Sequence, residues 1–452
     1  MKILRPIEIV MLMIFATAAT ARGAEVEQQD AVTVKIVSTW GGFSAFDRKL
    51  ATEFMATHPN IRIEFTSLGA DYDREKVRAY QAGDPYDMWL TGPFYSKWAT
   101  QAGYTIDPAP LFRRDFGPDY QSLFVNDFFW WQGKMVGVPF ARGSRVFYYN
   151  QDIIEAAGLP LPDEDWTWDD FVRIATGTVK YDSDGNIVQW GCTAFDPDLF
   201  RFYIGLEGQP LFSPDYRRAT IDTPAGRAAM IALHELAFKH QAMGTQALWG
   251  KVTDDVAYSW NIAAFNQGKV ALLLADDGGM KRRYEQAAQA SFRLGVAPLP
   301  ARKEKTANLE PTIFQIFKSR DPERTAAAWE FAKFWLTREN QVRLMTEAGY
   351  PPVRLDAYHD PVGQEFVRQW PILAVRHRAY KHARIESRIS EYPTMALEYI
   401  GIRPYVYHMM MGKLTPEEAV EQMQTKCQAV LDDFWSKADD GVFELFPEES
   451  HK

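Results

Sequence analysis

The sequence predicts an α/β protein made of two lobes, and three observations lead to this prediction. The chain has 452 residues, which is too long for one compact core. From residue 32 onward, strand-like and helix-like segments alternate, as in parallel sheets with helical crossovers. No low-complexity linker divides the chain, so we expect the lobes to be joined by several passages of the chain.

The start of the first lobe has a β-α-β pattern. Residues 32–37 alternate between apolar and polar side chains, which predicts a strand. Ser44 with Asp47 three residues later forms a capping-box pattern, so a helix is expected to begin there. Further strands are expected at 61–65 and 86–90. Consecutive parallel strands with helical crossovers follow from this order.

Helix-start signals become more frequent from the middle part of the chain onward. Thr167 and Asp170 repeat the capping-box pattern. A capping residue followed by proline, the pattern typical of a first helical turn, recurs at 223–224, 321–322 and 415–416. The second half is therefore predicted to be richer in helix.

Composition and motifs argue against several function classes. The net charge is −9 with both signs mixed along the chain, so nucleic acid is not expected as a partner. The chain lacks a G-x-S-x-G elbow, an H-E-x-x-H pair and a phosphate-cradling loop, so we expect no enzyme. Two cysteines cannot form a thiolate metal site alone and the eight histidines show no ligand spacing, so we expect neither metal nor cofactor.

Cys192 and Cys427 could form a disulfide after export or remain buried free thiols.

The N-terminus has the features of a signal peptide. Lys2 and Arg5 precede an uncharged, mostly apolar run at 9–21, which is too short to span a bilayer. Small residues suitable for cleavage follow at 19–21 and again at 21–23. We expect residues 1–23 to be removed and the mature chain to be periplasmic. No cysteine lies near the cleavage site, so no lipid anchor is expected there.

Seven short motifs, in order along the chain, resemble those of the extracellular solute-binding proteins of sugar ABC importers, the larger kind related to maltose-binding protein. The resemblance runs from about residue 32 to 434. The motifs lie at 133–139, 148–152, 157–171, 264–271, 295–300, 349–354 and 412–419.

The resemblance implies a type II periplasmic-binding-protein fold, in which two α/β lobes are joined by a three-crossing hinge. By motif position, the crossings are expected near 140–144, 274–276 and 316–319. The lobes would then comprise 31–141 with 276–317, and 144–274 with 320–452. The implied function is to capture a sugar or oligosaccharide in the cleft between the lobes and deliver it to the membrane permease of an ABC importer, as a monomer. Two alternatives stay open: an acidic or non-sugar solute such as a uronate or polyol, and a sensory ligand receptor.

Several expected ligand contacts follow strands of the first lobe, where loops at the carboxyl ends of parallel strands meet. One loop holds Trp40, Gly41 and Gly42; the glycines allow close backbone approach, and the tryptophan either stacks on a sugar or packs inside the lobe. The next candidates are Thr91, Gly92 and Tyr95. Many members of the resembled family carry an aspartate near position 91, so its replacement by threonine departs from their sugar-clamping pattern.

The remaining candidates lie near the expected crossings or carry over from the resemblance. Arg142 and Arg145 could pair with an acidic ligand, or form salt bridges at the hinge. Trp260 is a possible stacking platform or a core residue. Carboxylates near the crossings and one arginine in a family motif complete the set, namely Asp276, Asp277, Glu310 and Arg354. A basic segment at 376–388 is either a solvated helix face or a surface for the permease.

Overall fold

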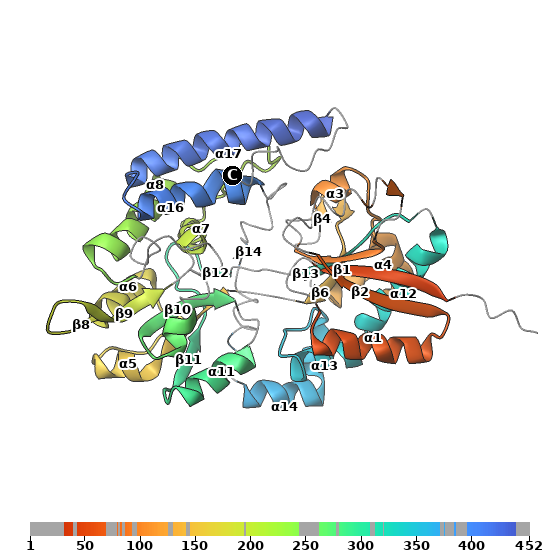
Figure 1. Ribbon diagram of the computed structural model, residues 1–452, viewed down its shortest axis with the longest axis horizontal. Helices are drawn as coiled ribbons and strands as arrows, with labels where there is room; N and C mark the ends of the chain where they lie inside the picture. Colours follow the sequence, from red (N-terminus) through yellow and green to blue (C-terminus); the bar gives the residue numbers. More distant parts are fainter. Residues whose placement is uncertain are drawn as a thin grey trace, which may run out of the picture.

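The computed structural model contains two five-stranded sheets, each forming the centre of one lobe (Figure 1). It describes residues 31–38, 43–68, 79, 82–83, 86–92, 97–124, 130–141, 145–193, 196–243, 262–276, 280–307, 312–319, 321–370, 375, 384–385 and 396–439. The predicted signal peptide lies outside these residues. Within them, no helix is both long and apolar enough to cross a bilayer.

The first sheet has the strand order β2-β1-β3-β13-β6. Its strands are β1 (Val32–Ser38), β2 (Ile61–Ser67), β3 (Met88–Thr91), β6 (Val138–Ala141) and β13 (Thr312–Ile316). β1 pairs in parallel with β2 and β3, whereas β13 is antiparallel to β3 and β6. The strands predicted at 32–37, 61–65 and 86–90 are therefore confirmed, with ends shifted by one or two residues.

The helices of the first lobe come from two separate parts of the chain. They are α1 (Ala45–Thr57), α3 (Lys97–Gln101), α4 (Ala109–Phe116), the 3₁₀ turns η2 (Tyr120–Ser122) and η4 (Leu355–His359), α12 (Pro322–Trp335), α13 (Arg338–Thr346) and α14 (Pro361–Gln369). The capping box predicted at Ser44 and Asp47 starts α1. Phe54 of α1 then packs on Phe331 and Phe334 of α12, which joins the two helices over β1.

The second sheet has the order β11-β7-β10-β9-β8. Its strands are β7 (Arg145–Asn150), β8 (Lys180–Tyr181), β9 (Ile187–Thr193), β10 (Val270–Asp276) and β11 (Leu294–Ala297). Helical segments surround it: α5 (Gln151–Ala156), α6 (Trp168–Gly177), α7 (Asp196–Leu206), α8 (Pro224–His234), α11 (Met280–Gln289), α16 (Arg403–Met410), α17 (Pro416–Asp439) and the π-helical segments η3 (Glu235–Lys239) and η5 (Leu397–Ile402). The predicted capping box at Thr167 and Asp170 is present at the start of α6.

Sheet pairing moves two of the expected lobe boundaries. β11 pairs with β7 in the second sheet, so the chain does not leave that lobe at 276 but between 297 and 312, where β13 enters the first sheet. α12 packs against β1, so residues after 320 remain with the first lobe; the chain returns before η5, which packs on α17. The expected lobes 276–317 and 320–452 therefore need correction. The cause is that β11 adds antiparallel to the edge of β7, a pairing that leaves no local sequence signal.

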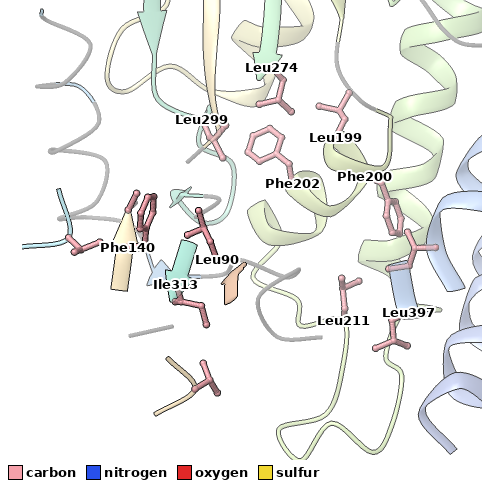
Figure 2. Close-up of a cluster of buried hydrophobic side chains, with 14 of the residues drawn as sticks. Leu90, Phe140, Leu199, Phe200, Phe202, Leu211, Leu274, Leu299, Ile313 and Leu397 are labelled. Carbon is pink, nitrogen blue, oxygen red and sulfur yellow. The ribbon is translucent and has the colours of Figure 1, made fainter. Parts of the chain in front are cut away.

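Buried apolar side chains continue from one lobe into the other. Figure 2 shows part of this cluster, with Leu90, Phe140 and Ile313 from the first sheet and Phe202 and Leu274 from the second lobe. Two small two-stranded sheets accompany the large ones. They are β4 (Trp130–Trp131) with β5 (Lys134–Met135), and β12 (Thr306–Ala307) with β14 (Arg384–Ile385).

Candidate ligand-binding site

The first lobe brings two predicted ligand loops to one edge of its sheet. β1 and β3 are parallel neighbours, with Ser38 opposite Leu90, so the two strands end at the same edge of the sheet. The Thr91 side chain is fully buried, and its Oγ1 has no hydrogen-bond partner among the described residues. A buried hydroxyl without a partner costs free energy, so a polar group supplied by a ligand would stabilise it.

The second lobe brings three strand ends together in a similar way. Arg145 at the start of β7 lies opposite Asp276 at the end of β10, and β10 is parallel to β9, which ends at Thr193. Arg145 Nη2 lies 3.1 Å from Oδ2 of Asp198, near the start of α7. The Arg145 guanidinium is therefore anchored in the second lobe at the edge where the crossing begins.

The Asp198 carboxylate also forms part of a longer chain of buried ion pairs. Its other oxygen accepts from Nη2 of Arg201, and Arg201 Nη1 donates to Glu398 at 2.5 and 2.6 Å. Arg403 Nε donates to Glu398 Oε1 at 2.9 Å. Burial opposes the charged form of Arg403, but the Glu398 carboxylate beside it raises its pKa above the usual range. Arg145 thus forms the salt bridge that sequence analysis left open as one of its two roles, and a ligand contact stays a prediction.

Arg354 is engaged within the first lobe. Its Nε and Nη2 donate to the Asp356 carboxylate at 2.8 and 3.1 Å, and Nη1 donates to the Leu336 carbonyl oxygen at 3.1 Å. Its guanidinium carbon also lies 5.6 Å from the ring centre of Phe124. These contacts fix the orientation of the side chain, and its predicted ligand contact is not tested by them.

Most other predicted contacts lie outside the described residues. These are Trp40, Gly41, Gly42, Tyr95, Arg142, Trp260, Asp277 and Glu310, together with most of the basic segment 376–388. Gly92 is buried directly after β3, and Asp276 is placed by its backbone. Among the described side chains, no cluster suited to a metal ion is found.

The sequence did not predict the buried ion pairs beside the edge of the second sheet. Asp198 and Arg201 stand three apart on a helix, a spacing that could have suggested an ion pair. Glu398 lies 197 residues from Arg201, and no local pattern links the two.

Comparison with known proteins decides the family. Residues 49–374, which run through both sheets, match the family model of bacterial extracellular solute-binding proteins. The chain belongs to this family. The predicted membership in the extracellular solute-binding proteins is thereby confirmed.

Individual relatives of this solute-binding protein are distant in sequence. It is 24% identical to the arabinooligosaccharide-binding protein of Halalkalibacterium halodurans over 248 residues, which is 54% of this chain and 52% of that protein. The match thus spans about half the length of that relative.

Solved structures of similar fold cover nearly all of the chain. An ABC substrate-binding protein of Listeria monocytogenes, in complex with cycloalternan, matches 89% of this chain and 100% of its own with a TM-score of 0.74 at 17% identity. A protein of Mycobacterium tuberculosis in complex with glycerophosphocholine matches 89% of this chain and 98% of its own with a TM-score of 0.71 at 19% identity. These likenesses confirm the predicted two-lobed type II fold. The family and these neighbours are binding proteins rather than enzymes.

Proposed function

We propose that this solute-binding protein captures a saccharide between its lobes and delivers it to the permease of an ABC importer. The observation that carries the proposal is the family match, which covers residues 49–374 and so includes strands of both sheets and the first two passages between the lobes. The arabino-oligosaccharide named for one relative and the cycloalternan bound by another support a saccharide ligand.

We place the proposed site between the ends of β1 and β3 in the first sheet and the edge of the second sheet that holds Arg145 and Asp276. Sugars present hydroxyl groups at the rim and C–H groups on their faces, so they need hydrogen-bonding groups and aromatic platforms. The Thr91 hydroxyl, buried and without a partner among the described residues, is a candidate for the first need. We assign Trp40, Tyr95 and Trp260 as platforms. The remaining polar contacts are assigned to Gly41, Gly42, Gly92, Arg142, Arg145, Asp276, Asp277, Glu310 and Arg354.

A second candidate is an anionic solute. Arg145 lies at the edge of the second sheet, and its guanidinium could donate to a carboxylate or phosphate of the ligand. Its side chain is only 13% exposed, so such a charge-assisted hydrogen bond would be largely shielded from water. The relative in complex with glycerophosphocholine supports this alternative. Within the same binding activity, the ligand could also be a uronate or a polyol. The protein could also act as a sensory ligand receptor.

Export, location and assembly complete the proposal. Residues 1–23 would serve as a cleaved signal peptide, and the mature chain would act in the periplasm as a monomer. Cell fractionation and N-terminal sequencing of the mature protein test the first two points, and light scattering tests the third.

A thermal-shift screen followed by calorimetric titration tests the function. The panel contains neutral oligosaccharides, polyols, uronates and glycerophosphodiesters. A ligand that binds only the folded state stabilises the protein by about 2.7 kcal/mol at 100 times its Kd, so the melting temperature of the protein should rise clearly. Stoichiometric binding of a neutral saccharide supports the first candidate, and binding of anions alone supports the second. Product formation during incubation, or no shift with any compound, would contradict both.

A further inference from the structure

Aromatic rings from the two lobes stack on one another beside the large sheets. Trp131 lies in the β4–β5 hairpin, and its Nε1 donates to Gln101 of α3 at 2.9 Å. Its ring centre lies 6.1 Å from that of Trp435, near the end of α17, with the rings 20° from parallel. A second ring, that of Tyr216 between α7 and α8, lies 5.2 Å away. The contact therefore joins the first lobe to the second.

A buried cation completes this contact. Lys97 is 3% exposed, and its Nζ lies 5.1 Å from the ring centre of Trp131 and 5.4 Å from that of Tyr216. One ammonium group thus faces a ring from each lobe. We call Lys97, Trp131, Tyr216 and Trp435 the interlobe clasp.

Contacts within the second lobe hold Tyr216 and Trp435 in place. Trp435 Nε1 donates to the Tyr216 carbonyl oxygen at 2.7 Å, and the Arg217 guanidinium carbon lies 4.4 Å from the Trp435 ring centre. Gln428 of α17 also donates to the Arg217 carbonyl oxygen at 3.0 Å. The end of α17 and the segment around Tyr216 are therefore held together by hydrogen bonds and a cation–ring contact.

The first-lobe half is attached to the proposed ligand edge. Lys97 is the first residue of α3, which begins six residues after the last residue of β3, Thr91. Behind α3, the Ile106 amide donates to the Ile316 carbonyl oxygen at 3.0 Å, which ties this region to β13. The region of α3 is therefore joined by a hydrogen bond to the sheet that also contains β3.

We infer that the interlobe clasp stabilises the lobe arrangement of this structure and so regulates ligand affinity. Ring stacking and cation–π attraction both fall away within a few ångströms, so any rotation that separates these rings loses them together. The clasp then sets the relative populations of the lobe arrangements in the absence of ligand. The apparent Kd depends on the fraction of molecules in the arrangement that can bind. Only the effect on affinity rests on the proposed function.

Paired spin labels test the lobe balance directly. Cysteines at the exposed positions Ala56 of the first lobe and Ser183 of the second carry the labels, because both native cysteines are buried. In the ligand-free protein, Trp131→Ala should lower the population at the spacing of this structure about tenfold relative to other spacings. Lys97→Met, which keeps the chain length without the charge, should act in the same direction with a smaller effect.

Matched variants separate the clasp from general damage. Phe238→Ala removes an exposed ring whose centre lies 4.7 Å from that of His234 within one lobe, and it should leave the label distances unchanged. If Trp131→Ala does not fold, Trp435→Phe and Lys97→Met carry the test. Folded clasp variants with wild-type distances would overturn the inference.

Affinity measurements then test the regulatory part. With a ligand from the screen, the apparent Kd should change in inverse proportion to the fraction of molecules in the binding-competent lobe arrangement. Altered distances with an unaltered Kd would overturn the link to affinity. If no compound binds even the wild-type protein, the proposed function fails, while the ligand-free distances still decide whether the clasp holds the lobes.

Discussion

Arg201 in α7 donates from one nitrogen to both carboxylate oxygens of Glu398 in η5, at 2.5 and 2.6 Å. Each side chain is only 2% exposed. Asp198 and Arg403 extend the pair at its two ends, and Arg145 connects it to the edge of the second sheet. This chain of ion pairs joins α7 to the C-terminal helices, which come almost two hundred residues later.

Neutralising Glu398 should strongly destabilise the second lobe. Glu398→Gln keeps the shape of the side chain but removes the carboxylate that Arg201 and Arg403 share, while Arg201 keeps its ion pair with Asp198. Breaking a buried pair in this way costs about 3–5 kcal/mol. Urea unfolding followed by fluorescence measures the loss. Asp433→Asn, in the exposed pair with Lys437, is the control and should change stability by less than about 0.5 kcal/mol. Equal stabilities of the two variants would contradict the prediction.

Gly191 in β9 should not tolerate any side chain. A Cβ built at this position would lie 1.6 Å from the carbonyl oxygen of Ala175 in α6, so the helix and strand would have to move apart. We expect Gly191→Ala to cost about 3 kcal/mol or to abolish soluble expression. Val188→Ala on the same strand changes a half-exposed side chain and serves as the control. Melting temperatures of the two variants test this; a normal melting curve for Gly191→Ala would rule it out.

Local sequence signals predicted the elements well, and the distant pairings poorly. Ser44 with Asp47 marked the start of α1 because a capping box involves only neighbouring residues. By contrast, β11 looks the same in sequence whichever sheet it joins, and only its pairing with β7 places it.

The candidate site follows the same division. Thr91 and Arg145 could be proposed as ligand contacts because they adjoin strand ends or motifs, and they stay predictions. The partners that hold Arg145, beginning with Asp198, depend on how α7 packs and so left no pattern in the sequence.

Both thiols should be unreactive in the folded protein. Cys192 and Cys427 are buried and are not joined by a disulfide, and burial raises the pKa of the Cys427 thiol far above its usual range. The reactive thiolate is therefore scarce at neutral pH. A disulfide-exchange reagent such as DTNB should label no thiol in the native protein and two in about 8 M urea. Ala56→Cys, at an exposed position, should add one fast-reacting thiol as the control. No labelling in urea without reductant would mean that the two cysteines are bonded.

His408 should make the protein less stable in mild acid. Burial lowers the pKa of this imidazole below its ordinary 6.5, and the positive charge of Lys413 acts in the same direction. The unfolded chain then binds the proton more readily than the folded one. The stability that the neutral ring contributes is therefore present above pH 6.5 and is lost as the pH falls towards the folded pKa.

His408→Gln should show a smaller loss of stability than the wild type when urea midpoints are compared at about pH 7.5 and about pH 5. Lys413→Met offers an independent check, because removing its charge should bring the pKa of His408 part of the way back towards its ordinary value. The pH dependence of this variant should lie between those of the wild type and His408→Gln. Identical midpoint differences in all three proteins would show that His408 does not titrate differently in the folded and unfolded states.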